Sequence, residues 1–129
     1  MTGIETVEAM ERAVGLGDWD LAAEYLAPDL VYRCAGLPAR QGVQGLRDHM
    51  AAQGKLVRWE GHETHLAWEK DGIVVIEVTS FFHRQEDGAR ISVPCTDIYR
   101  FDEKGRIADW GVYADISVFR ADARQDVLS

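Results

Sequence analysis

The sequence predicts an α+β fold in which three helices pack on a curved, mostly antiparallel sheet, and three features support this. Apolar residues recur at helical spacing in the first half of the chain. After residue 55 they recur mainly at every second position, and turn sequences divide this part into strands. Because the helices precede the strands instead of alternating with them, a parallel α/β arrangement is disfavoured. The length of 129 residues suits one domain, which we expect to span residues 1–129.

Three segments of the first half have the pattern of amphipathic helices, and a short strand lies between the second and the third. The first helix has apolar residues at every third or fourth position from Ile4 to Val14. The second opens at Asp18, a favoured N-cap residue, and is ended by Pro28, and the third stops at Gly54. We expect the helices in the segments 4–17, 18–29 and 43–54 and the strand at 30–35.

Four strands follow, each separated from the next by a short turn rich in Asp and Gly. The Asp-Gly pair at 71–72 is typical of a two-residue hairpin turn, and longer turns are expected near Asp87 and at 102–105. We expect the strands at residues 55–70, 73–84, 89–101 and 106–119.

The turns set the register of these strands and so predict which side chains share a face. A turn centred on Asp87 places Glu77 opposite Asp97, between Leu66 and Trp110. This face is mostly apolar or aromatic, so we expect the helices to cover it. It would carry His62, Thr64, Leu66, Trp68, Glu77, Thr79, Phe81, His83, Ile91, Val93, Cys95, Asp97, Tyr99, Trp110, Val112, Ala114 and Ile116.

The opposite face would also carry an apolar patch, which is large for a monomer. We therefore expect a homodimer that forms through this outer face of the sheet. The patch would contain Val74, Ile76, Val78, Phe82, Ile98 and Tyr113.

An acid on a helix-covered face must be paired or uncharged, because a lone charge in an apolar setting costs several kcal/mol. Two adjacent carboxyl groups there are expected to share a proton, which raises the pKa of one of them. Asp97 and Glu77 would form such a pair, and their placement predicts acid–base chemistry near neutral pH.

The segment TDIYRFDEKGRI (96–107) resembles the strand and turn of ketosteroid isomerase that carry its oxyanion-hole acid, which matches Asp97. The order of helices and strands likewise resembles the cone-shaped fold of the nuclear-transport-factor-two-like superfamily, over nearly the whole chain. The segment RFDEKGRIADW (100–110) followed by YAD (113–115) is similar to the SnoaL-like polyketide cyclases of that superfamily. The resemblance implies a small hydrophobic molecule in the cone and offers Asp115 as a candidate base, although strand parity places Asp115 on the outer face.

The same resemblance shows that two known residue sets are incomplete here. The general base of ketosteroid isomerase falls near Cys34, and its oxyanion tyrosine falls on Met10. The aspartate that limonene epoxide hydrolase carries on its last strand matches Val112, and Glu77 and Thr79 stand where its Arg and Asp would be. The resemblance therefore implies the fold and leaves the reaction open.

Three residues are candidate catalytic groups: Asp97, Glu77 and His62. The candidate ligand-binding residues, each of which could instead be ordinary core, are Tyr32, Cys34, Met50, Trp68, Phe81, Tyr99, Trp110 and Val112. We expect no metal, because HETH (62–65) lies in a strand and its two histidines would point to opposite faces. We also expect no cofactor.

Composition narrows the class of protein further. The chain has 22 acidic and 14 basic residues, which argues against nucleic acid as a partner. It has no apolar run long enough for a membrane span and nothing that resembles a signal peptide, so we expect a cytoplasmic protein. The leading hypothesis is a cofactor-independent acid–base enzyme (isomerase, cyclase, dehydratase or hydrolase). The alternatives are a non-catalytic protein that binds a hydrophobic molecule and an interaction protein whose cone is filled.

Overall fold

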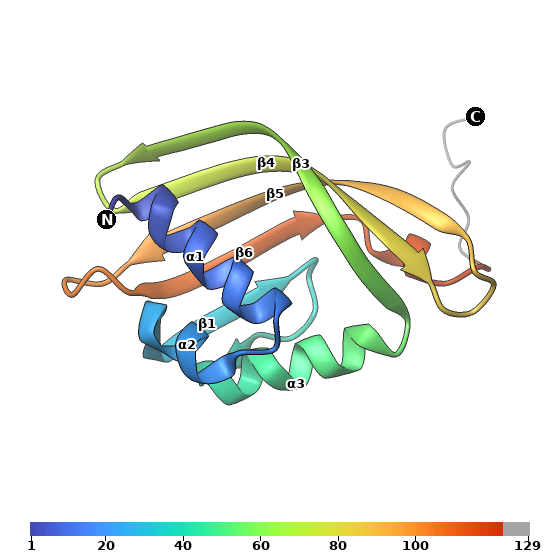
Figure 1. Cartoon of the computed structure of the whole chain (residues 1–129), viewed down its shortest axis with the longest axis horizontal. Coiled ribbons are helices and arrows are strands. Elements are labelled where there is room, and N and C mark those ends of the chain that lie inside the picture. Colours follow the sequence, from blue (N-terminus) through green and yellow to red (C-terminus); the bar gives the residue numbers. More distant parts are fainter. Residues whose placement is uncertain (123–129) are drawn as a thin grey trace.

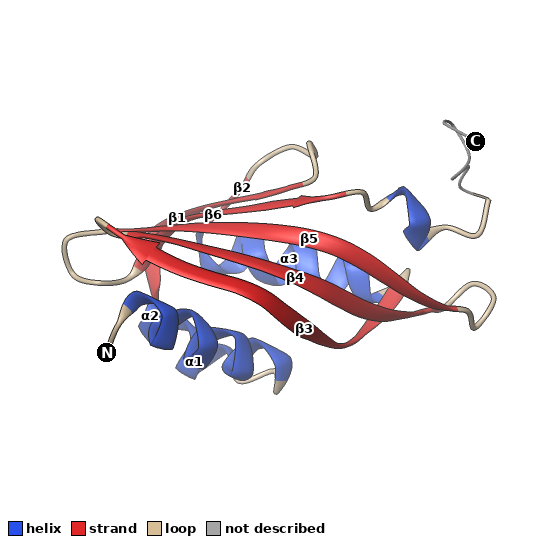
Figure 2. Ribbon diagram, turned by 90° about the horizontal axis from the view of Figure 1, so that it is seen from above, coloured by secondary structure: helices blue, strands red, loops and turns tan. Residues whose placement is uncertain are grey.

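A computed structural model describes residues 1–122 and shows an α+β fold in which a curved six-stranded sheet arches over three helices (Figures 1 and 2). The sheet order is β2-β1-β6-β5-β4-β3, with β1 parallel to β6 and the other neighbours antiparallel. The helices are α1 (Gly3–Gly15), α2 (Trp19–Tyr25) and α3 (Gly42–Gly54). The strands are β1 (Leu26–Cys34), β2 (Arg40–Gln41), β3 (Val57–Lys70), β4 (Ile73–Arg84), β5 (Arg90–Phe101) and β6 (Ile107–Ala114).

The ends of α1 and α2 are fixed by side chains that accept hydrogen bonds from free backbone N–H groups. Thr2 and Glu5 form a reciprocal capping box at the start of α1. The Glu69 carboxylate, from β3, also accepts hydrogen bonds from the N–H groups of Gly3 (2.9 Å) and Ile4 (3.1 Å). Asp18 caps α2, as the sequence predicted. These contacts tie α1 to the sheet and fix which of its side chains point inward.

The turn between β4 and β5 differs from the predicted one by one residue. As a result, every side chain of β4 lies on the face opposite to the predicted one. The turn has four residues, Gln85–Gly88, and the Gly88 N–H donates to the Arg84 carbonyl oxygen (2.9 Å). It is therefore centred between Glu86 and Asp87, and Gly88 has the positive φ of 74° that this turn requires. Asp97 consequently pairs with Ile76 instead of Glu77.

The predicted outer apolar patch is wrong, because the change of face in β4 places four of the six residues of the patch on the inner face. Val74, Ile76, Val78 and Phe82 are buried under the helices. The outer face instead exposes a different set of large apolar side chains: Leu66, Trp68, Phe81 and Tyr113.

An irregularity in β3 brings His62 back to the inner face. The register of β3 on β4 shifts between Thr64 and Leu66, so His62 pairs with Ser80, whereas the sequence predicted Phe81. A second shift, between Trp59 and His62, contains Gly61 at φ 110°, a conformation that favours glycine and is typical of a bulge.

The last hairpin follows the predicted parity, although β6 is shorter than expected. A register shift between Arg100 and Phe101 pairs Asp97 with Val112. The strand ends at Ala114, and Ser117–Phe119 form a 3₁₀ turn where the sequence predicted more strand. Asp115 is exposed and accepts hydrogen bonds from the Ser117 N–H and hydroxyl, so it lies outside the inner face, as parity predicted.

Candidate active site

The helices and the inner face of the sheet enclose a cavity of about 480 Å³. Its volume is within the range of small-molecule sites in proteins. The cavity follows the strands from Asp97 to Val93 and beyond, and four residues of strand correspond to about 13 Å. Most of its wall is apolar, for example Ile76, Val78 and Phe82, and its acids lie together at one end. The space therefore suits an elongated hydrophobic molecule with one polar group.

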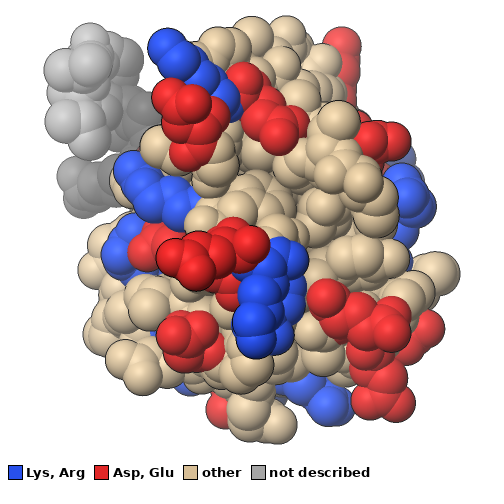
Figure 3. Space-filling view, turned by 90° about the vertical axis from the view of Figure 1, so that its left-hand side faces the viewer, with Lys and Arg blue, Asp and Glu red and all other residues tan. Residues whose placement is uncertain are grey.

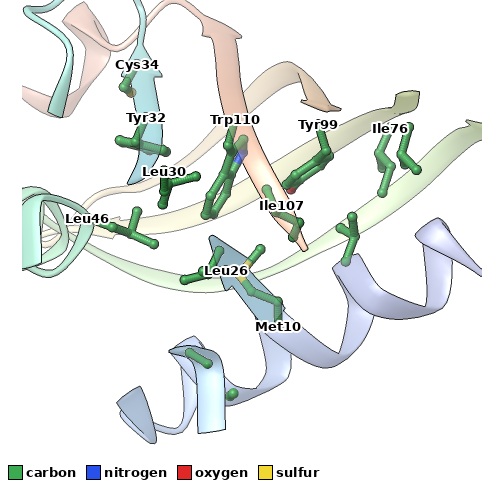
Figure 4. Packing of buried hydrophobic residues seen from close by; sticks show 14 of the residues in the cluster. Met10, Leu26, Leu30, Tyr32, Cys34, Leu46, Ile76, Tyr99, Ile107 and Trp110 are labelled. Carbon is green, nitrogen blue, oxygen red and sulfur yellow. The ribbon is translucent and has the colours of Figure 1, made fainter. Parts of the chain in front are cut away.

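Asp97 stands in this wall and accepts hydrogen bonds from three side chains. The Cys95 thiol donates to Oδ1 (2.9 Å), and the Trp110 indole Nε1–H donates to Oδ2 (3.2 Å). The Tyr99 hydroxyl lies 3.0 Å from Oδ2. Tyr99 itself is fully buried and its ring stacks on that of Trp110, with 5.2 Å between the ring centroids (Figure 4). The carboxyl group of Asp97 is thus held in one position.

The Tyr99 hydroxyl also contacts a second acid, Glu11 on α1, and this contact reveals the real carboxyl pair. Its oxygen lies 2.7 Å from Oε1 of Glu11. A phenol has one proton, so it can donate to only one of the two carboxyl groups. The other carboxyl group must carry a proton of its own to form its hydrogen bond. The geometry of Glu11, Tyr99 and Asp97 therefore fits one negative charge shared by two acids.

The electrostatics of both acids agree with this geometry. Desolvation and, to a smaller extent, the charge of Asp97 raise the pKa of Glu11 to about 7, against the lowering effect of the Tyr99 hydrogen bond. Desolvation also raises the pKa of Asp97, although its three hydrogen bonds oppose this. The Glu11 side chain is 25% exposed, and both acids line the cavity. The pair is expected to titrate as a unit near neutral pH.

His62 is the next ionisable group along the wall. Its Nε2 atom lies 4.0 Å from Oε2 of Glu11, and its side chain is 26% exposed. Its ring lies beside that of Trp59, with 5.6 Å between the centroids. An imidazole in this position can exchange a proton with Glu11 after a small movement.

The thiols and phenols of the site are poor bases or nucleophiles. Desolvation raises the pKa of both Cys34 and Cys95, so both thiols stay protonated at neutral pH. Desolvation also raises the pKa values of Tyr32 and Tyr99. Tyr32 packs edge-on against Trp110 with 4.9 Å between the ring centroids, and together they form part of the cavity wall (Figure 4).

The structure brings together most of the predicted site residues and separates three. Asp97, His62, Tyr32, Cys34, Met50, Trp110 and Val112 line the cavity, and Tyr99 lies behind its wall. Glu77, Trp68 and Phe81 do not line it, because the four-residue turn and the regular pairing near Lys70 place them on the outer face. Glu77 and Trp68 are exposed, and so is Phe81, so their predicted inward placement is wrong.

Sequence reasoning missed Glu11, although the sequence holds a signal for it. Glu11 follows Ile4 by seven residues and Val7 by four, and it precedes Val14 by three. It therefore occupies the apolar face of α1. An acid in the apolar stripe of a helix that covers a cavity is a candidate for the partner of another inward acid.

Other kinds of site find little support in the part of the chain that the structure describes. No three His, Cys, Asp or Glu side chains within residues 1–122 gather as metal ligands would. On the face shown in Figure 3, Lys and Arg side chains lie scattered among acidic ones and form no broad basic patch. Among the described helices, none has the length and apolar character to cross a membrane.

Solved structures share this fold at low sequence identity. A protein with a ketosteroid isomerase-like fold from Catenulispora acidiphila, in complex with trimethylamine, has a TM-score of 0.77 at 18% identity, covering 92% of each chain. An LEH-like epoxide hydrolase from Mycobacterium tuberculosis has a TM-score of 0.70 at 24% identity, covering 88% of this chain and 83% of its own. TerC, co-crystallised with polyporic acid, has a TM-score of 0.75 at 16% identity, covering 91% and 94%. At these identities the likeness concerns the fold.

A comparison with curated proteins found no match. The family model of the SnoaL-like domain matches residues 7–110, a range that contains Glu11, His62, Asp97 and Tyr99. The helices, the mixed sheet and this match agree with one another. The chain therefore belongs to the SnoaL-like domain family.

Proposed function

We propose that this protein is a cofactor-independent acid–base enzyme that removes a proton from a carbon atom next to a carbonyl group in a small hydrophobic substrate. The observation that carries the proposal is the Tyr99 hydroxyl, which bridges the carboxyl groups of Glu11 and Asp97 at one end of an apolar cavity. A carboxyl pair in which the pKa of Glu11 is raised to about 7 and that of Asp97 is also raised supplies both an acid and a base at neutral pH.

The reaction uses the shared proton in two ways. The charged carboxylate takes the proton of the substrate C–H bond, and the bonding electrons move to the carbonyl oxygen to form an enolate. The protonated carboxyl group turns its proton from the Tyr99 hydroxyl to that oxygen, and the new hydrogen bond stabilises the charge of the enolate. The Tyr99 hydroxyl lets a proton pass between the two acids, since it contacts both. Return of a proton to another carbon completes an isomerisation, and attack by the enolate on a second carbonyl completes a cyclisation.

The residues that line the cavity favour the binding of an uncharged or weakly polar substrate. Among the described residues, no Lys side chain lines it, and its Arg58 side chain is largely solvent-exposed. A carboxylate or phosphate would meet the negative charge of Glu11 and Asp97 without a buried cation to balance it. Relatives of the same fold include an epoxide hydrolase and a protein crystallised with polyporic acid, which is consistent with a small organic ligand.

The test uses 1-tetralone, a bicyclic ketone with protons next to its carbonyl group, in deuterated buffer at neutral pH. We expect wild-type protein to accelerate incorporation of deuterium at that carbon, as mass spectrometry or proton NMR would measure. The control is an equal concentration of the protein unfolded in denaturant, because dispersed carboxylates would then give only the background rate. Equal rates for the folded protein and this control would contradict the proposed function.

A second candidate is a non-catalytic protein that binds a hydrophobic molecule. The observation in its favour is Cys34, which stands where the resemblance to ketosteroid isomerase expects the base and whose thiol stays protonated. In that case 1-tetralone would quench the fluorescence of Trp59 or Trp110 in the cavity and be recovered without deuterium.

The homodimer and the cytoplasmic location stay proposals. The exposed apolar side chains of the outer face support a dimer through that face, with Leu66, Trp68, Phe81 and Tyr113 at its centre. The molar mass in solution, from light scattering, would be near twice 14.5 kDa for the dimer.

A further inference from the structure

We infer that His62 connects the Glu11–Tyr99–Asp97 network to solvent, so that the proton taken from the substrate leaves the site through a relay. The inference rests on the proposed function, because a relay is useful only if the carboxyl pair takes up protons from a ligand. It assigns to His62 the role of exchanging protons between Glu11 and water.

The relay follows a continuous series of polar atoms. Oδ2 of Asp97 lies 3.0 Å from the Tyr99 hydroxyl, and that hydroxyl lies 2.7 Å from Oε1 of Glu11. Oε2 of Glu11 then lies 4.0 Å from Nε2 of His62. The last step exceeds hydrogen-bond length, and a small rotation of the ring or one bridging water would close it. Tyr99 passes protons by giving one and receiving another, so no separate charge has to cross the core.

The position of His62 in the wall suits the outer end of such a relay. Tyr99 is fully buried, whereas the His62 side chain is 26% exposed, so the series runs from the interior toward solvent. The ring lies beside Trp59, which is 43% exposed. Charged groups face His62 from two other elements, Glu11 from α1 and Asp97 from β5. Both of these groups are acids, so they can exchange a proton with the imidazole.

The fold places His62 there through a local departure from regular strand geometry. The register shift between Thr64 and Leu66 turns the strand so that His62 lies opposite Ser80, which also lines the cavity. A second shift follows between Trp59 and His62, where Gly61 has a φ of 110°. A histidine that merely filled space would need no carboxylate 4.0 Å from its Nε2 atom, and this carboxylate is the one that contacts Tyr99.

The relay predicts the fate of the substrate proton. With His62 present, the proton equilibrates with solvent before it can return to the same carbon. Without His62, exchange with solvent depends on Glu11 alone, whose side chain is 25% exposed, and more of the protons return to the carbon that they left. The relay therefore suits reactions in which the substrate gains or loses a proton overall, such as cyclisation or dehydration, better than an isomerisation that moves one proton internally.

The test compares His62→Ala with wild type in the exchange of 1-tetralone in deuterated buffer. We expect the exchange rate at saturating ketone to fall by about tenfold or more, while the dissociation constant for 1-tetralone from tryptophan fluorescence stays within about twofold. Added imidazole is expected to restore much of the lost rate in His62→Ala and to leave the wild-type rate unchanged. A residue with a purely structural role would not give this rescue.

The matched control is His65→Ala, on the same strand. Its imidazole hydrogen-bonds the Thr79 hydroxyl (2.8 Å) away from the cavity, so its loss should leave the exchange rate unchanged and imidazole without effect. An unchanged rate in His62→Ala, or a reduced rate that imidazole does not restore, would overturn the relay and leave the proposed function standing. Absence of exchange in the wild type would overturn both.

Discussion

Asp97→Asn is expected to reduce the rate at which the protein exchanges the α-protons of 1-tetralone by about 10² to 10⁴, the usual contribution of a general acid or base. The amide cannot take up or release a proton at neutral pH, so the shared proton of the network loses one of its two sites. With its oxygen in the place of Oδ2, the amide can still accept from the Trp110 indole and from the Tyr99 hydroxyl, and its nitrogen, in the place of Oδ1, can donate to the Cys95 sulfur. The fold should therefore survive the change.

The control for this variant is Asp29→Asn, which alters an exposed aspartate on β1. It should exchange at the wild-type rate, and circular dichroism should show folded protein for both variants. Wild-type exchange by Asp97→Asn would contradict the role of the carboxyl pair.

Glu11→Gln is expected to stabilise the protein at alkaline pH and to flatten its pH dependence. The pKa of Glu11 is raised from 4.5 to about 7 in the folded protein, so the folded state binds more protons than the unfolded state between these values. The contribution of Glu11 to the free energy of unfolding is thus fully present below pH 4.5, and it is lost as the pH rises through about 7. A shift of this size corresponds to about 3 kcal/mol, and desolvation of Asp97 acts in the same direction.

The measurement is urea unfolding of wild type and Glu11→Gln from pH 4.5 to 8.5. The two proteins should have similar free energies of unfolding at the acidic end, and the variant should be the more stable by about 3 kcal/mol at the alkaline end. Glu24→Gln, which removes an exposed acid from α2, should keep the wild-type curve. A variant curve parallel to that of the wild type would show that Glu11 is charged throughout this range.

The inward placement of Asp97 could be predicted from the sequence because the two register errors in the β5–β6 hairpin add up to an even number of residues. The register of this hairpin differs from the predicted one by two residues, and a shift of two leaves every side chain on its face. Tyr99, Trp110 and Val112 are placed correctly for the same reason. The order of helices and strands was predictable because each helix has a clear apolar stripe and a cap or stop.

Glu77 was assigned to the wrong face because a register shift of one residue moves every side chain of a strand to the opposite face. The sequence EDG indicates a turn, but it does not show whether the loop has four residues or an odd number. In the structure, the positive φ of Gly88 and its hydrogen bond to Arg84 give a loop of four residues. The error in β4 and the register shift between Thr64 and Leu66 cancel for His62, so its inward position was predicted for an incomplete reason. The apolar stripe of α1 marks Glu11 as an inward acid, but its pairing with Asp97 could be found only from the structure, since no local motif links residues 11 and 97.

The most direct test of the shared proton is a ¹³C NMR titration of protein labelled at the side-chain carboxyl carbons of Glu and Asp. One carboxyl resonance should titrate with a midpoint near pH 7 and should disappear in Glu11→Gln, and the resonance of Asp97 should respond in the same range because Tyr99 couples the two. A spectrum in which every carboxyl group has lost its proton by pH 5 would contradict the account, because Glu11 and Asp97 would then both be charged on either side of a single hydroxyl proton.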